Sequence, residues 1–131
     1  MKKHGVFKEE KFLLIFDQIL KGLSYMHSLK ILHWDIKLEN ILLTHDDWVK
    51  ICDFGISIKI NSKMSIQEHI GTPAYLSPEV ILKRGFLDLK SDVWSLGVMT
   101  FICLTGQVPF KGEDIQQLNW CIVGYEATIP S

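Results

Sequence analysis

Two short motifs lie close together in the chain and limit the folds open to it. The pattern H-x-D-x-K-x-x-N spans residues 33–40, and D-F-G spans residues 53–55. The aspartate and lysine of the first motif can orient a hydroxyl group and neutralise charge on a phosphoryl group in transfer. Asn40 and Asp53 carry oxygen atoms of the kind that magnesium prefers as ligands. Either motif alone is weak, but both in this order predict a fold that brings residues 35–40 next to Asp53.

The sequence between the motifs predicts a β-hairpin. Residues 41–43 and 49–52 are mainly apolar, and the polar residues 44–47 form a turn between them. A hairpin here places Asn40 and Asp53 at neighbouring strand ends, where both can reach one cation.

Helices are predicted on both sides of this hairpin. Residues 9–29 repeat apolar side chains at helical spacing, which indicates one buried face. A second helix is expected from Ser91 and Asp92, as its capping residues, to about Thr105, and Gly106 ends it. This helix is apolar on nearly every side and is expected in the centre of the fold. An amphipathic helix is expected over residues 113–121, and a mobile loop over residues 56–70.

With two further motifs, these residues resemble the protein kinase superfamily, specifically the C-terminal lobe of a serine/threonine kinase. G-T-P-A-Y-L-S-P-E at residues 71–79 is similar to the end of the family's activation segment, with Ser77 where alanine is usual, and S-D-V-W-S-L-G at residues 91–97 is a further match. The resemblance implies a mainly α fold with a small β-hairpin, in which residues 1–131 form a partial kinase domain, the C-lobe. The motif style is most similar to calmodulin-dependent and AMP-activated kinases.

The resemblance implies transfer of the ATP γ-phosphoryl group to a protein serine or threonine, with ATP and Mg²⁺ as cofactors. Asp35 would orient the substrate hydroxyl group, and Lys37 would steady the transferred group. The positions that match nucleotide-binding residues of the family are Lys37, Glu39, Asn40, Leu42 and Asp53, and the metal ligands among them are Asn40 and Asp53.

Thr72 and Leu42 each have a simpler structural interpretation. Thr72 is either a turn residue or, as the resemblance implies, a third catalytic residue whose hydroxyl group links Asp35 and Lys37. Leu42 is expected in the core, and its family counterpart also lies beneath the adenine ring.

The two residues before Asp35 concern packing and regulation. By resemblance, His33 packs against Phe54 with support from Asp92, and it is not a general base. Trp34 departs from the family, which usually has an arginine that binds a phosphate on the activation segment, and an indole cannot make that contact. Either this kinase is not switched on by phosphorylation of its loop, or Trp34 reflects drift in an inactive copy.

The amino-acid composition limits the classes of binding partner and the cellular location that we expect. The net charge is −1, from 14 basic and 15 acidic residues, so neither nucleic acid nor a membrane surface is an expected partner. Cys52, Cys103 and Cys121 have no metal-binding spacing and are expected to be buried thiols in a reducing compartment. We find no signal sequence and no apolar run long enough to span a bilayer, so a cytoplasmic or nuclear location is expected.

Two functions stay open at this level. In the first, the chain belongs to an active kinase, and an N-terminal lobe or regulatory chain completes the nucleotide site, because no G-x-G-x-x-G or V-A-I-K motif precedes residue 33. In the second, it is a pseudokinase-like or truncated module that offers a substrate-docking surface. The isolated chain is expected to have little or no activity, because a nucleotide would lie on one exposed face.

Overall fold

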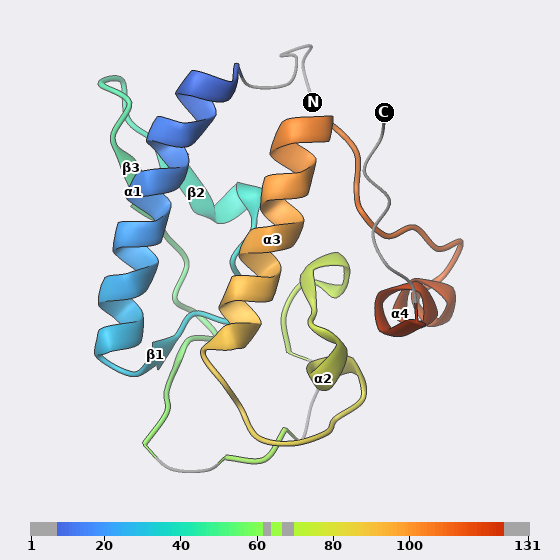
Figure 1. Cartoon of the computed structure of the whole chain (residues 1–131). Helices are drawn as coiled ribbons and strands as arrows, with labels where there is room; N and C mark the ends of the chain where they lie inside the picture. Colours follow the sequence, from blue (N-terminus) through green and yellow to red (C-terminus); the bar gives the residue numbers. More distant parts are fainter. Residues whose placement is uncertain (1–7, 62–63, 67–69, 125–131) are drawn as a thin grey trace.

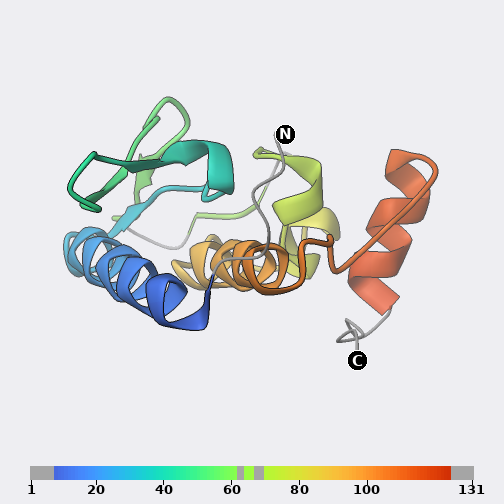
Figure 2. The same ribbon diagram turned by 90° about the horizontal axis from the view of Figure 1, so that it is seen from above.

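The computed structural model describes residues 8–61, 64–66 and 70–124. Two long helices, α1 (Glu9–Ser28) and α3 (Lys90–Thr105), lie side by side in one layer (Figure 1). Figure 2 shows the short strands and the motif loops on one side of this layer. Two smaller helices, α2 (Pro78–Ile81) and α4 (Ile115–Gly124), contact each other. The fold is mainly helical with a few antiparallel strands, as expected for a partial kinase domain.

Helix α1 forms where the apolar spacing predicts it, and it ends one residue earlier, at Ser28. Two glutamates in its first turn favour this start because they face the positive end of the helix dipole. Its apolar face packs against α3 and the motif loop in one main cluster. The fully or nearly buried members of this main cluster are Phe12, Ile15, Ile19, Leu23, Met26, Ile36, Tyr75, Leu96, Val98, Met99 and Cys103.

The predicted hairpin is present. Strand β2 (Ile41–Leu43) pairs antiparallel with β3 (Val49–Ile51), and the Cα partners are Ile41 with Ile51 and Leu43 with Val49. Leu42 is 51% exposed, so its predicted place in the core is wrong. Ile41, Val49 and Ile51 of this two-stranded ribbon pack against the main cluster, whereas Leu42 and its Cα partner Lys50 are both exposed.

The loop predicted over residues 56–70 contains regular structure, so that prediction is only partly right. Strand β4 (Ile58–Lys59) pairs antiparallel with β1 (Ile31–Leu32), and Ser65 forms an isolated bridge with Phe86. Residues 62–63 and 67–69 lie outside the described part. Strand β1 contributes Leu32 to a second apolar cluster, whose buried members are Leu32, Ile66, Leu76, Val80 and Leu87.

Helix α3 begins differently from the prediction. Neither Ser91 nor Asp92 caps it: the backbone N–H of Lys90 donates to Oδ1 of Asp88 at 2.9 Å. Asp92 is fully buried and accepts hydrogen bonds from the motif loop instead. The end is as predicted, because Gly106 adopts the left-handed conformation (φ 70°) that a glycine enters without steric cost.

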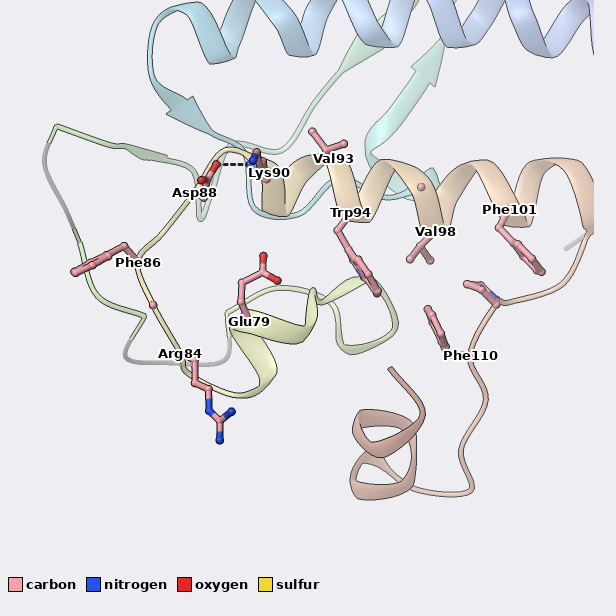
Figure 3. Close-up of a pocket in the computed structure, with 13 residues that line it drawn as sticks. Glu79, Arg84, Phe86, Asp88, Lys90, Val93, Trp94, Val98, Phe101 and Phe110 are labelled. Atoms are coloured by element: carbon pink, nitrogen blue, oxygen red, sulfur yellow. Dashed lines mark hydrogen bonds between the residues drawn. The ribbon is translucent and has the colours of Figure 1, made fainter. Parts of the chain in front are cut away.

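Helix α3 was expected to be buried on nearly every side, but only one of its sides is buried. Leu96 and Met99 are buried against α1, whereas Val93 is 53% exposed. The open side borders a groove of about 970 Å³, shown in Figure 3. Its floor is apolar, and the ring of Trp94 stacks on Phe110 with 5.9 Å between ring centroids.

The last predicted helix is also present but shifted, since α4 runs from Ile115 to Gly124 rather than over 113–121. Within the described residues, no helix combines the length and the apolar character that crossing a bilayer requires. The thiols of all three cysteines are free, and only Cys103 is buried, so the prediction of burial is wrong for the half-buried Cys52 and Cys121.

Candidate active site

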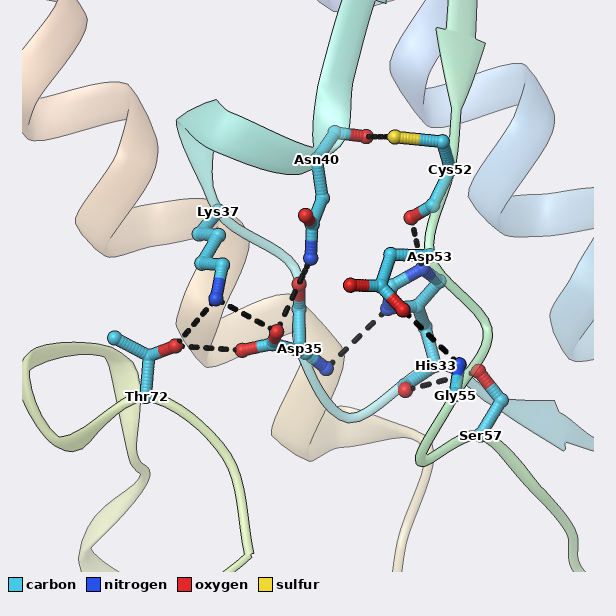
Figure 4. Close-up of polar contacts among 9 residues, drawn as sticks. All are labelled: His33, Asp35, Lys37, Asn40, Cys52, Asp53, Gly55, Ser57 and Thr72. Carbon is cyan, nitrogen blue, oxygen red and sulfur yellow. Dashed lines mark hydrogen bonds and ion pairs between the residues drawn. The ribbon is translucent and has the colours of Figure 1, made fainter.

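Asp35, Lys37 and Thr72 form a closed triangle of polar contacts. The Thr72 hydroxyl group donates to Oδ1 of Asp35 at 2.7 Å and accepts from Nζ of Lys37 at 2.8 Å. Nζ of Lys37 also lies 2.8 Å from Oδ2 of Asp35. Figure 4 shows all three side chains converging from two separate segments. The linking position that the resemblance implied for Thr72 is therefore the one it occupies.

This environment keeps the Asp35 carboxyl group ionised. Burial by itself raises the pKa of Asp35, but hydrogen bonds from Lys37, Thr72 and Asn40, with the positive charge of Lys37, outweigh it. The pKa of Asp35 therefore lies below its ordinary value. An ionised carboxylate held in one orientation can accept a hydrogen bond from a hydroxyl group and direct that group's oxygen.

Asn40 connects the triangle to the second motif. It is 5% exposed, and its Nδ2 donates to the backbone oxygen of Asp35 at 2.8 Å and to Oδ2 at 3.1 Å. Its own backbone oxygen accepts from the N–H of Cys52 at 2.9 Å, across the end of the hairpin. Asp53 follows directly, and its carboxylate is directed towards the Asn40 side chain (Figure 4). The hairpin thus brings Asn40 and Asp53 together, as the sequence predicted.

The donor set in this corner fits a hard cation such as Mg²⁺. Both hydrogen bonds of the Asn40 side chain use Nδ2, so Oδ1 is the atom suited to a metal. The Asp53 side chain is exposed, and one of its oxygens, Oδ1, accepts from the N–H of Gly55 at 3.2 Å. Its backbone φ of 63° lies in the left-handed region, where strained residues often mark functional sites. In the described segments, no group of three or more His, Cys, Asp or Glu side chains gathers around a possible metal position.

His33 is a packing and hydrogen-bonding residue. Its ring lies 4.9 Å from the ring of Phe54, as expected, and the residue is fully buried. Nε2 lies 3.0 Å from the backbone oxygen of Cys52, and Nδ1 lies 3.3 Å from the backbone N–H of Asp35. A carbonyl oxygen can only accept and an N–H can only donate, so in this arrangement Nε2 donates and Nδ1 accepts. Since both nitrogens are occupied, the geometry argues against a role as general base.

Asp92 fastens the motif loop to α3. Its carboxylate accepts from the backbone N–H groups of His33 at 2.9 Å and Trp34 at 2.8 Å. His27, which the sequence gave no reason to connect with the site, lies 2.9 Å from the same carboxylate. No local pattern could have revealed this contact, because His27 and Asp92 are far apart in the chain and no motif links them.

Glu39 and Leu42 lie at the margin of this network. Both are exposed, and no hydrogen bond joins either side chain to the triangle in the described part of the chain. Their predicted contacts with a nucleotide stay predictions.

Comparison with known proteins agrees with this geometry. Residues 1–128 match the family model described as "Protein kinase domain". The chain is 38% identical over its whole length to "Probable serine/threonine-protein kinase MARK-A" of Dictyostelium discoideum, of which it covers 12%. It is 37% identical to "Serine/threonine-protein kinase SAPK9" of Oryza sativa subsp. japonica, with 96% of this chain and 37% of that protein covered. It is also 34% identical over its whole length to "Sperm motility kinase 2B" of Mus musculus, of which it covers 27%.

The chain thus spans between about a tenth and two fifths of these relatives' own lengths. The family match, in contrast, extends over almost every residue and includes both motifs of the polar cluster. The chain therefore belongs to the protein kinase family.

Proposed function

We propose that residues 1–131 correspond to the C-lobe of an ATP-dependent kinase that phosphorylates serine or threonine in a protein substrate. The observation that carries this proposal is the closed contact set of Asp35, Lys37 and Thr72, joined through Asn40 to the corner that contains Asp53. Phosphoryl transfer depends mainly on position and charge neutralisation, and this cluster supplies both.

Each residue of the cluster has a separate task in the proposed reaction. Asp35 accepts a hydrogen bond from the substrate hydroxyl group and orients its oxygen towards the phosphorus atom. Lys37, held by Thr72, places a positive charge beside the group in transfer. Oδ1 of Asn40 and the Asp53 carboxylate would hold Mg²⁺, which when bound neutralises charge on the ATP phosphates.

The nucleotide would lie over this exposed surface, with Leu42 beneath the adenine ring and Glu39 at its edge. An N-terminal lobe or regulatory chain is proposed to cover the phosphates, because one open face buries too little of a nucleotide. The proposal also places the protein in the cytoplasm or nucleus.

Phosphate transfer to a peptide tests the proposal. We expect little or no transfer by the 131-residue chain alone, and measurable transfer when an N-terminal kinase lobe is supplied. In the completed enzyme, Asp35→Asn should lower kcat by about 10²- to 10⁴-fold. Asp46→Asn, on a side chain that is 82% exposed in the hairpin turn, is the matched control and should leave kcat unchanged. Equal activity of Asp35→Asn and the parent chain would show that Asp35 does not act in catalysis.

A second candidate function, a non-catalytic docking module, is favoured by the groove beside α3. Its volume of about 970 Å³ and its apolar floor are sufficient for a segment of another polypeptide. The two functions differ in their response to nucleotide. A module would show no rise in melting temperature with Mg²⁺ and ATP, and no transfer that depends on Asp35, even with the lobe supplied.

A further inference from the structure

We propose that Trp34 is a positioning residue that holds segment 71–76 against the motif loop, so that Thr72 reaches Asp35 and Lys37. This inference rests on the proposed function, in which Asp35 is the residue that orients the substrate. It assigns a task to the position at which the chain departs from the usual arginine.

The indole ring of Trp34 packs in the space between the motif loop and the residues after Thr72. It lies against the second apolar cluster, which includes Leu76 and Val80. With these residues it borders a cavity of only about 10 Å³, which has room for about one water molecule at most. The ring therefore fills the space between two segments that are far apart in the sequence.

The indole ring of Trp34 makes this contact by apolar packing and not by a hydrogen bond. Nε1 of Trp34 is buried and has no hydrogen-bond partner among the described residues. A buried donor without a partner is unfavourable, so the indole N–H cannot be what selects tryptophan here. An aromatic ring without that N–H should serve as well.

The backbone of Trp34 makes a second contact with the same segment. A Cβ atom added at Gly71 would lie 2.9 Å from the carbonyl oxygen of Trp34 and 3.1 Å from Cδ2 of Leu76. Gly71 also has a φ of 117°, which side chains rarely allow. The chain therefore passes the carbonyl group of Trp34 at a distance that only glycine permits, one residue before Thr72.

The position of Trp34 is itself determined from α3. Its φ of 69° is left-handed, and its N–H donates to Oδ1 of the buried Asp92 at 2.8 Å. Asp92 thus fixes Trp34, Trp34 holds residues 71–76, and Thr72 completes the triangle with Asp35. The indole packs against apolar residues and makes no hydrogen bond among the described residues, so this arrangement needs no phosphate group.

The Thr72 hydroxyl proton reports on this arrangement, because that hydroxyl group donates to Oδ1 of Asp35 at 2.7 Å. We suggest measuring by NMR how fast this proton exchanges with water in the full 131-residue chain. Trp34→Ala should abolish its slow exchange, and Trp34→Phe should leave the exchange rate as in the parent. Trp120→Ala, on a side chain in α4 that is 78% exposed, is the matched control and should have no effect.

A pair of glycine variants tests the same coupling without deleting the indole. Gly71→Ala should also speed the exchange of the Thr72 hydroxyl proton, since the new methyl group would push the segment away from Trp34. Gly85→Ala is the matched control, because its φ of 85° imposes a similar backbone cost while a Cβ atom there meets nothing within 4 Å. If Trp34→Ala fails to fold, this pair decides the question.

A second hydroxyl proton separates positioning of Thr72 from general loosening of the fold. The Thr100 hydroxyl group donates to the backbone oxygen of Leu96 at 2.8 Å inside α3, and its exchange rate should not change in Trp34→Ala or Gly71→Ala. An equal acceleration at Thr72 and Thr100, or no acceleration at Thr72 in both variants, would overturn the proposal. The exchange measurement does not require phosphate transfer, so a chain that never phosphorylates a peptide can still give a positive result.

Discussion

Removing the carboxylate of Asp92 should destabilise the chain more than most single substitutions. Asp92 is fully buried and accepts three hydrogen bonds, at 2.9 Å from His33, 2.8 Å from Trp34 and 2.9 Å from His27. Hydrogen bonds to a charged group contribute about 1.5–3 kcal/mol each, and a buried N–H left without a partner costs about 1–3 kcal/mol. These terms overlap, so we expect Asp92→Ala to lower the free energy of unfolding by about 3–5 kcal/mol.

Urea denaturation followed by circular dichroism measures this loss. With a slope of about 2 kcal/mol per molar urea, the midpoint should fall by about 2 M. Asp88→Ala is the matched control, because Asp88 is exposed and accepts one hydrogen bond from the start of the same helix. It should cost about 1 kcal/mol. A loss below about 1 kcal/mol for Asp92→Ala, or equal losses for the two variants, would refute the anchoring role of Asp92.

Three further outcomes are expected. Contacts in the folded chain lower the pKa of Asp35, so the ionised carboxylate stabilises the folded state. This stabilisation is complete above the pKa of Asp35 in the unfolded chain, about 4, and is lost as the pH falls through the pKa in the folded chain. The difference in unfolding free energy between the parent and Asp35→Asn should therefore be constant above about pH 5 and shrink below about pH 4, and a constant difference down to pH 2 would contradict this. Burial raises the pKa of the Cys103 thiol, so a thiol reagent should modify Cys103 more slowly than Cys52 or Cys121, and 8 M urea should remove the difference. Gly106→Ala should lower the unfolding free energy by about 1 kcal/mol, because the φ of 70° at this position is unfavourable for a residue with a side chain. Calorimetry measures this loss, and an unchanged unfolding free energy would contradict the prediction.

The parts of the fold that were predictable are those that depend on local sequence. The apolar spacing of residues 9–29 identified α1 to within one residue, and the polar turn at 44–47 identified the hairpin with its ends at Asn40 and Asp53. Both patterns report on interactions between residues a few positions apart, which is why they can be recognised without a structure.

The errors arose where distant contacts outweighed local preference. An aspartate near the start of a helix usually caps it, but Asp92 bonds to His33 and Trp34, which lie almost sixty residues away, and Asp88 takes the local role. Leu42 is apolar and lies in a strand, yet it is half-exposed, because its neighbours Ile41 and Ile51 pack against the main cluster and Leu42 does not. Neither outcome can be derived from spacing.

From its residues alone, this chain has the side chains of a phosphoryl-transfer site and a hairpin that brings two of them to one corner. Motif order and apolar period are properties of neighbouring residues, so they do not depend on how the rest of the chain packs. The sequence does not reveal that residues 71–76 bring Thr72 to Asp35, or that Gly71 passes close to Trp34. Both contacts depend on how α3 and the second apolar cluster pack in the tertiary structure. A hydrogen bond of 2.7 Å between residues 35 and 72 requires a unique path for the backbone, and that path is set by close packing of buried side chains from several elements.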